Sequence, residues 1–124
     1  MERERDILVV DDQAGIRLLL QDILVNEGYR VTTAQTGMEA MDLLHTTMFD
    51  AIILDYKLPV LNGVEVLKRM EKDGLHIPAI MITGMKEALL TEIAGVDADI
   101  KVLAKPFNVE EVCTLMQSML AKED

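Results

Sequence analysis

The sequence has a single cysteine, no tryptophan, two tyrosines, two phenylalanines and three prolines in 124 residues. One thiol excludes an internal disulfide, and the helical spacing of Cys113 with Val112 and Met116 predicts a core thiol in a reducing compartment. No apolar run approaches the roughly 20 residues that span a membrane. The N-terminus mixes acidic and basic residues, unlike a secretory signal. We therefore expect a cytoplasmic protein without a membrane partner.

Basic residues are also scarce, since 12 Lys and Arg stand against 22 Asp and Glu, a formal net charge of −10. Nucleic acid is not an expected partner, because its phosphates would be repelled. Half of the residues are hydrophobic, which is enough for one core and excludes a disordered or fibrous chain. With no linker, repeat or low-complexity tract, we expect one domain over residues 1–124, and the net charge favours a monomer.

Short apolar runs alternate with amphipathic helical spacing, a pattern typical of a parallel sheet covered by helices on both faces. The apolar runs predict five strands, at residues 7–10, 30–34, 51–54, 79–82 and 101–104. The first helix should end at Glu27-Gly28, where glycine supplies a cap, and the other helices should span 38–45, 64–71, 86–94 and 109–121. The sequence thus predicts an α/β fold with a doubly wound, five-stranded parallel sheet.

Polar side chains follow four of these strands. Asp11 and Asp12 follow the first strand, and Asp55 follows the third. Thr83 follows the fourth strand and Lys105 the fifth. Ligands of doubly wound sheets bind at the carboxyl ends of the strands, beside the point where strand order reverses. With the strand order 2-1-3-4-5, the first and third strands are neighbours there, and the three carboxylates converge.

Three carboxylates in one cleft repel one another, and a divalent cation relieves the repulsion. Mg²⁺ takes one or two carboxylates and leaves room for phosphate oxygens, so we expect Mg²⁺ or its substitute Mn²⁺. A carboxylate can also attack a phosphoryl group to form an aspartyl phosphate. Lys105 and the Thr83 hydroxyl could then neutralise and hydrogen-bond the phosphoryl oxygens.

Each of these residues has a plainer interpretation when it is taken alone. Asp12 and Asp55 could be helix N-caps, and Thr83 could be an ordinary turn residue. Lys105 could be a solvated lysine. The position of all these residues at one expected edge of the sheet favours the functional interpretation.

At these residues the sequence resembles the response-regulator receiver domain of two-component signalling, over essentially the whole chain. The resemblance implies a flavodoxin-like, CheY-like fold in which Asp55 accepts a phosphoryl group. It implies a metal site at Asp11 and Asp12, with Asp55 and the main-chain carbonyl of Lys57. The matching segments are Ile7-Leu8-Val9-Val10-Asp11-Asp12, Ile53-Leu54-Asp55, Leu58-Pro59-Val60-Leu61-Asn62-Gly63, Ile82-Thr83 and Lys105-Pro106-Phe107.

The resemblance also implies that Thr83 is a switch hydroxyl, that Lys105 contacts the phosphoryl group, and that the bond before Pro106 is cis. Two positions depart from the family pattern. Val102 stands where many receivers have an aromatic residue coupled to the switch, which favours a relay in which the partner reads the phosphoryl group itself. Asn62 stands where Asp is usual, and we expect only a change in turn hydrogen bonding there.

Within the family, the segments Gly15-Ile16-Arg17 and Leu67-Lys68-Arg69-Met70 resemble single-domain, sporulation-type phosphotransferases. This resemblance implies a phosphorelay intermediate with Mg-dependent self-phosphorylation and no ordinary enzymatic turnover. Its partners would be a sensor histidine kinase, a histidine-containing phosphotransferase and, as a third candidate, an aspartyl-phosphate phosphatase. The alternatives are a stand-alone receiver that binds a target when phosphorylated, and a phosphatase with an aspartate nucleophile.

The chain stops at Asp124 without an output domain, so we expect output through a partner protein. The expected docking residues flank the acidic site, with Gln13, Gly15 and Ile16 on one side and Pro106 and Phe107 on the other. The alternative for Ile16 and Phe107 is ordinary packing at the edge of the core.

Overall fold

The computed structural model describes residues 4–96 and 99–121, so the ends of the expected domain and residues 97–98 lie outside the described chain. Five parallel strands form one sheet in the order β2-β1-β3-β4-β5, which confirms the predicted fold class. The strands are β1 (Asp6–Val10), β2 (Arg30–Ala34), β3 (Ala51–Asp55), β4 (Ala79–Thr83) and β5 (Ile100–Ala104). The helices are α1 (Ala14–Asn26), α2 (Gly37–Thr46), α3 (Gly63–Lys72), α4 (Lys86–Ile93) and α5 (Val109–Ala121).

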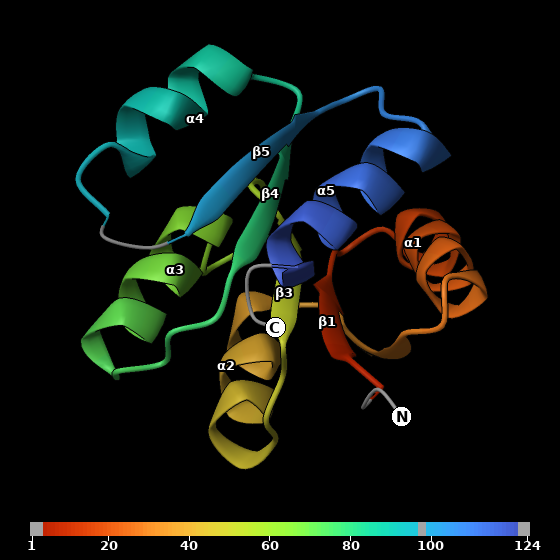
Figure 1. Cartoon of the computed structure of the whole chain (residues 1–124). Coiled ribbons are helices and arrows are strands. Elements are labelled where there is room, and N and C mark those ends of the chain that lie inside the picture. The colour runs from red at the N-terminus through yellow and green to blue at the C-terminus, as the bar shows by residue number, and fades with distance from the viewer. Residues whose placement is uncertain (1–3, 97–98, 122–124) are drawn as a thin grey trace.

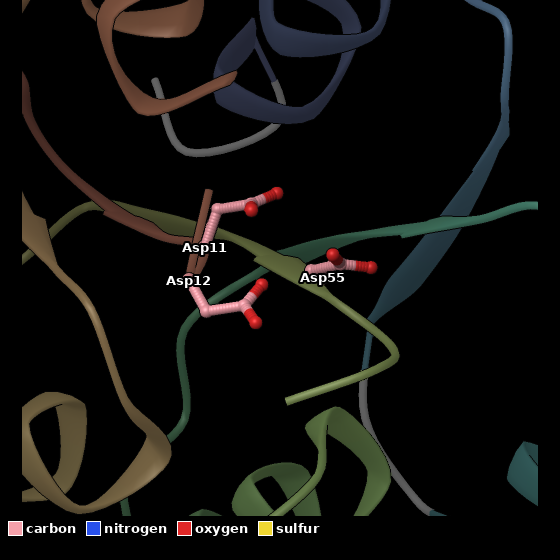
Figure 2. Close-up of side chains that lie close together, drawn as sticks. All are labelled: Asp11, Asp12 and Asp55. Atoms are coloured by element: carbon pink, nitrogen blue, oxygen red, sulfur yellow. The ribbon is translucent and has the colours of Figure 1, made fainter. Parts of the chain in front are cut away.

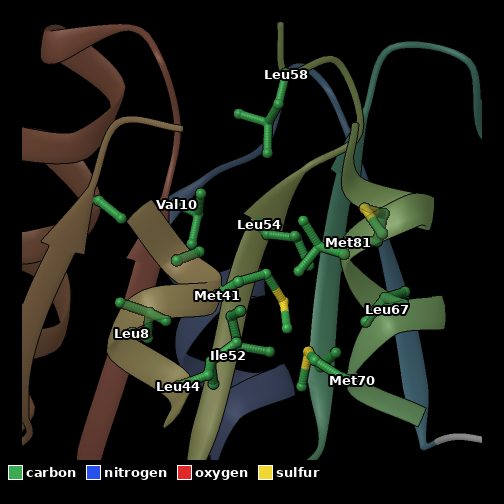
Figure 3. Packing of buried hydrophobic residues seen from close by; sticks show 14 of the residues in the cluster. Leu8, Val10, Met41, Leu44, Ile52, Leu54, Leu58, Leu67, Met70 and Met81 are labelled. Carbon is green, nitrogen blue, oxygen red and sulfur yellow. The ribbon is translucent and has the colours of Figure 1, made fainter. Parts of the chain in front are cut away.

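The sheet lies between two layers of helices, with α1 and α5 on one face and α2, α3 and α4 on the other (Figure 1). Alternate residues of each central strand enter the two cores, so Leu8 packs toward α2 and α3 while Ile7 packs toward α1 and α5. Figure 3 shows the first of these cores. Among the described residues, no helix has the length and apolar character that crossing a membrane requires.

Two central strands continue one residue further than the sequence predicted. Parallel pairing extends to Asp55 with Ile82 and to Thr83 with Ala104. Asp55 and Thr83 therefore belong to their strands, because backbone pairing continues through a polar residue when the neighbouring strand is in register. The other elements have the predicted bounds or differ by a single residue at one end or at both.

Side-chain caps fix the starts of the two helices that follow β2 and β3. The Thr36 hydroxyl accepts a hydrogen bond from the Glu39 N–H at 3.1 Å. At α3, Asn62 Oδ1 accepts from the Glu65 N–H at 2.9 Å, and Glu65 Oε1 accepts from the Asn62 N–H at 3.2 Å, a capping box. Asn62 thus caps a helix, which goes beyond the change in turn bonding that we expected, and asparagine serves this role as well as aspartate.

Cys113 packs against the core but is only half-buried, so the prediction of a core thiol is correct only in part. The apolar face of α5 is centred on Val112 and Met116, both 0% exposed, and Cys113 projects beside that face. Burial raises the pKa of the Cys113 thiol, and a hydrogen bond to the Glu27 carboxylate raises it further. The thiol is therefore protonated, and unreactive in that form, at neutral pH.

Gly63, the first residue of α3, packs directly against the backbone that carries Asp55. A Cβ atom at Gly63 would lie 2.6 Å from the main-chain oxygen of Asp55 and 2.7 Å from Met81 Sδ. The Gly63 N–H also donates to the main-chain oxygen of Tyr56 at 2.9 Å. The absence of a side chain therefore lets α3 approach the end of β3 this closely.

We expect Gly63→Ala to lower the free energy of unfolding by about 2 kcal/mol, because the added methyl group enters filled space. Urea unfolding followed by circular dichroism would measure the change. Gly15→Ala is the matched control, since Gly15 lies in α1 and no described residue comes within 4 Å of its Cβ position. Helix propensity predicts that this control gains up to about 1 kcal/mol. A gain of stability in both variants would contradict the close approach at Gly63.

Candidate functional site

Three carboxylates meet at the carboxyl ends of the neighbouring strands β1 and β3 (Figure 2). One oxygen atom from each of Asp11, Asp12 and Asp55 lies within 4.8 Å of the others. Asp11 and Asp55 are 1% and 5% exposed, whereas Asp12 faces solvent. The structure therefore brings together the acidic residues that the topology predicted, and two of the three are buried.

Asp11 is held by main-chain groups on its own side of the cluster. Its N–H donates to the Ala34 carbonyl at 3.2 Å, and its Oδ1 accepts from the Gln13 N–H at 2.8 Å. Its Oδ2 is, within the described residues, the one buried side-chain nitrogen or oxygen without a hydrogen-bond partner. Burial raises the pKa of Asp11; the Gln13 N–H opposes this rise, and the charge of Asp55 adds to it. A buried oxygen without a donor, beside two more carboxylates, is an arrangement that a cation would satisfy.

Asp55 accepts one long hydrogen bond on each carboxylate oxygen. Lys105 Nζ lies 3.3 Å from Oδ2, and the Lys57 N–H lies 3.3 Å from Oδ1. The Lys105 N–H donates to the Thr83 carbonyl at 2.8 Å, which fixes the end of β5 beside that of β4. Thr83 is 2% exposed, and its hydroxyl oxygen accepts from the Met85 N–H at 2.9 Å. The hydroxyl proton of Thr83 can therefore donate to another acceptor.

The plainer interpretations of these residues are correct only in part. Neither Asp12 nor Asp55 caps a helix, because the N-cap positions of α1 and α3 fall on other residues. Thr83 does have a turn role, through its bond to the N–H two residues later. Lys105 is about one-third exposed but forms an ion pair with Asp55, so it is more than a solvated lysine. The bond between Lys105 and Pro106 is cis, as the family resemblance implied.

The expected docking residues border the acidic cluster and differ in exposure. Gln13, Gly15 and Pro106 are exposed. Ile16 and Phe107 are half-buried, and both pack against the core between the sheet and helices α1 and α5. Packing at the edge of the core therefore accounts for part of each apolar side chain, and the remaining part faces solvent.

Two side-chain contacts near the site were not predicted from the sequence. Arg17 Nη1 donates to the main-chain oxygen of Asp11 at 2.8 Å. The Tyr56 hydroxyl, one residue after Asp55, donates to Glu92 Oε1 in α4, and this bond raises the pKa of Tyr56. Arg17 is the one basic residue in α1, and its place beside an acidic loop is a signal that could have identified it. No sequence pattern pairs Tyr56 with a residue 36 positions later.

Comparisons with known proteins agree with one another. The family model for the response regulator receiver domain matches residues 7–117. The chain is 36% identical to sporulation initiation phosphotransferase F of Bacillus subtilis (strain 168) over 106 residues, which covers 86% of each protein. It is 37% identical to response regulator MprA of Mycobacterium sp. (strain KMS) over 117 residues, 94% of this chain and 50% of that protein, so it spans about half the length of this relative. The solved structure of chemotaxis protein CheY4 of Vibrio cholerae matches 94% of this chain and 99% of that one, with a TM-score of 0.85 and 33% identity.

Proposed function

This chain belongs to the response regulator receiver family, and on that basis we propose that it carries a phosphoryl group on Asp55 and passes it to a histidine of a partner protein. The observation that carries the proposal is the Asp55 carboxylate itself, 5% exposed, beside two other carboxylates and 3.3 Å from Lys105 Nζ. The likeness to sporulation initiation phosphotransferase F supports the relay role.

In the proposed reaction, an Asp55 carboxylate oxygen forms a bond to phosphorus while the bond from phosphorus to the donor's leaving group breaks. The leaving group departs with the electron pair of that bond. Lys105 neutralises charge on the phosphoryl oxygens, and the Thr83 hydroxyl donates a hydrogen bond to one of them. In the onward step a histidine nitrogen of the partner attacks phosphorus, and Asp55 leaves as a carboxylate.

The acidic cluster fits a divalent cation, for which we propose Mg²⁺, or Mn²⁺ in its place. All three side chains offer carboxylate oxygens, the ligands that these hard cations prefer, and the buried Oδ2 of Asp11 lacks a donor in the described part of the chain. Asp11, Asp12 and Asp55 would hold the ion together with the main-chain carbonyl of Lys57. When bound, the ion supplies positive charge against the carboxylates and the phosphoryl oxygens.

We propose that a sensor histidine kinase is the donor and a histidine-containing phosphotransferase the acceptor, with an aspartyl-phosphate phosphatase as a third partner. The partner surface would comprise residues that border the cluster. These are Gln13, Gly15, Ile16, Pro106 and Phe107, each partly or fully exposed.

A second candidate function is a stand-alone receiver that binds its target when phosphorylated. The contact between Tyr56 and Glu92 favours it, because it connects the loop after Asp55 to the surface helix α4. A change at Asp55 would then have a physical route to α4. The two functions differ in whether the phosphoryl group leaves the protein.

The first test is phosphorylation by a small donor. We expect incubation with Mg²⁺ and acetyl phosphate to raise the intact mass by one phosphoryl group, because Asp55 supplies the nucleophile. The gain should be absent in Asp55→Asn and in the presence of a chelator. Asp42→Asn, which alters an exposed aspartate of α2, should gain mass like the parent. A folded parent that gains no mass would contradict the role of Asp55.

The second test distinguishes the relay from the stand-alone receiver. Phosphorylated protein is mixed with a cognate histidine phosphotransferase, and the mass of both proteins is followed over time. Transfer of the phosphoryl group to the partner's histidine is the expected result. A phosphoryl group that stays on Asp55, together with phosphorylation-dependent binding of a target without an acceptor histidine, would instead support the stand-alone receiver.

A further inference from the structure

The junction between β1 and α1 carries two of the three carboxylates but lacks the side-chain cap found at α2 and α3. At α2 and α3 the N-cap side chain accepts a hydrogen bond from a helical N–H. At α1 the N-cap residue Gln13 makes no such bond, and the first turn contains no acidic residue. No side-chain cap therefore ties this loop to α1, and Asp11 is bonded to α1 in another way.

Arg17 provides this bond from one turn inside α1. Its side chain is half-buried, and Nη1 donates to the main-chain oxygen of Asp11 at 2.8 Å. The Asp11 N–H and Oδ1 are bonded to Ala34 and Gln13 on the other sides. Asp11 is thus held at its amide nitrogen, its carbonyl oxygen and one carboxylate oxygen, while Oδ2 stays without a partner among the described residues.

We propose that Arg17 is a positioning residue that presents Asp11 to the divalent cation. The inference rests on the proposed function, because it takes the acidic cluster as the metal site. Arg17 itself bonds to the backbone of Asp11, so its action on the cation passes through the placement of that residue. Removing the hydrogen-bond partner of a metal ligand typically weakens metal binding about 10- to 100-fold.

The charge of Arg17 acts in the opposite direction from its hydrogen bond. A guanidinium near the cluster repels a cation, so removal of this charge alone would tighten Mg²⁺ binding. Loss of the positioning contact would weaken Mg²⁺ binding. The sign of the change in affinity therefore distinguishes a positioning role from a purely electrostatic one.

Calorimetric titration of the metal-free full chain with MgCl₂ tests this proposal. We expect Arg17→Gln to raise the Mg²⁺ dissociation constant about 10-fold. Arg17→Lys retains the charge and can still donate a hydrogen bond but loses the planar guanidinium, so its affinity should fall between those of Arg17→Gln and the parent. The control Arg69→Gln removes the same charge from the exposed last turn of α3, and its dissociation constant should stay within about twofold of the parent's, since exposed charges are screened.

Each outcome of the titration bears on a different part of the proposal. Unchanged or tighter Mg²⁺ binding by folded Arg17→Gln would overturn the positioning role and leave the metal site in place. A parent that binds no Mg²⁺ would contradict the metal site, and the positioning role with it. If Arg17→Gln does not fold, Arg17→Lys decides, because weaker binding than in the parent supports the proposal and equal binding overturns it.

Discussion

Asp11→Asn is expected to raise the stability of the metal-free protein by about 2 kcal/mol, because it removes a buried charge that lies beside like charges. Asp11 is 1% exposed, and its Oδ2 has no hydrogen-bond partner among the described residues. Asparagine keeps Oδ1 as the acceptor for the Gln13 N–H and places an amide donor beside Asp12 and Asp55. The same change removes a metal ligand, so Mg²⁺ binding should weaken on the order of 100-fold.

The gain in stability should depend on pH in a defined direction. Burial raises the pKa of Asp11 above its ordinary value of 3.8, so the folded protein holds this proton more tightly than the unfolded chain. The stability that the proton contributes is complete below the ordinary pKa and is lost as pH rises through the raised, folded pKa. Asparagine has no such titration. The advantage of Asp11→Asn should therefore be smallest in acid and reach its full value above the folded pKa.

Urea unfolding between pH 4 and about 8, with a chelator present, would measure this difference. Excess Mg²⁺ should narrow or reverse the stability advantage of Asp11→Asn, because the ion stabilises the parent through its tighter binding to the folded state. Asp42→Asn is the control for the loss of an exposed carboxylate in α2. Equal stability of Asp11→Asn and the parent at neutral pH without metal would contradict the cost assigned to the buried carboxylate.

Lys105→Met is expected to slow phosphoryl uptake on the order of 100-fold or more, the usual effect of removing one group that stabilises transition-state charge. Lys105 Nζ lies 3.3 Å from Asp55 Oδ2, within reach of an incoming phosphoryl group. Methionine keeps much of the apolar stem, so the change removes chiefly the charge. The cluster also becomes more negative, and its Mg²⁺ affinity should rise.

The rate of mass gain from acetyl phosphate, at saturating Mg²⁺, would test the variant with the metal site filled. Lys101→Met is the matched control. Lys101 lies on β5, the strand that Lys105 follows, and Lys101 pairs in register with Ile80 rather than with a site residue. The control should keep the parent's rate within about twofold, since Lys101 is half-buried at the end of β5 away from the site and a distant charge contributes little to the reaction. Phosphoryl uptake by Lys105→Met at the parent's rate would contradict the proposed role of Lys105 in the reaction.

The sheet could be predicted because its strands carry their own signal. The apolar run of β1 has no alternation, as a strand covered on both faces requires, and β2 begins and ends where the sequence indicated. The ends of β3 and β4 could not be predicted, because pairing with a neighbouring strand keeps Asp55 and Thr83 in the sheet. A side chain's polarity reports its environment, whereas the end of a strand depends on a partner distant in the sequence.

In the candidate site, too, some features follow from the sequence pattern and the topology, whereas others depend on contacts that the pattern does not specify. The convergence of Asp11, Asp12 and Asp55 followed from topology, since parallel strands end at one edge of a sheet. The bond from Arg17 to Asp11 depends on the path of the intervening loop, which periodicity does not specify. The bond between Tyr56 and Glu92 depends on how α4 packs, and that is equally absent from local patterns.

The position of β1 between β2 and β3 bears on how the chain folds. Residue Ile7 of β1 pairs with Ala51 of β3, so the carboxylates at the ends of these two strands are far apart until a large loop has closed. The repulsion between Asp55 and the other two carboxylates, and the affinity of all three for a cation, both arise at that one step of folding. A partly folded chain without the β1–β3 pair has only the adjacent pair Asp11 and Asp12. A divalent cation would therefore select, from the partly folded chains, those in which β1 and β3 have already joined.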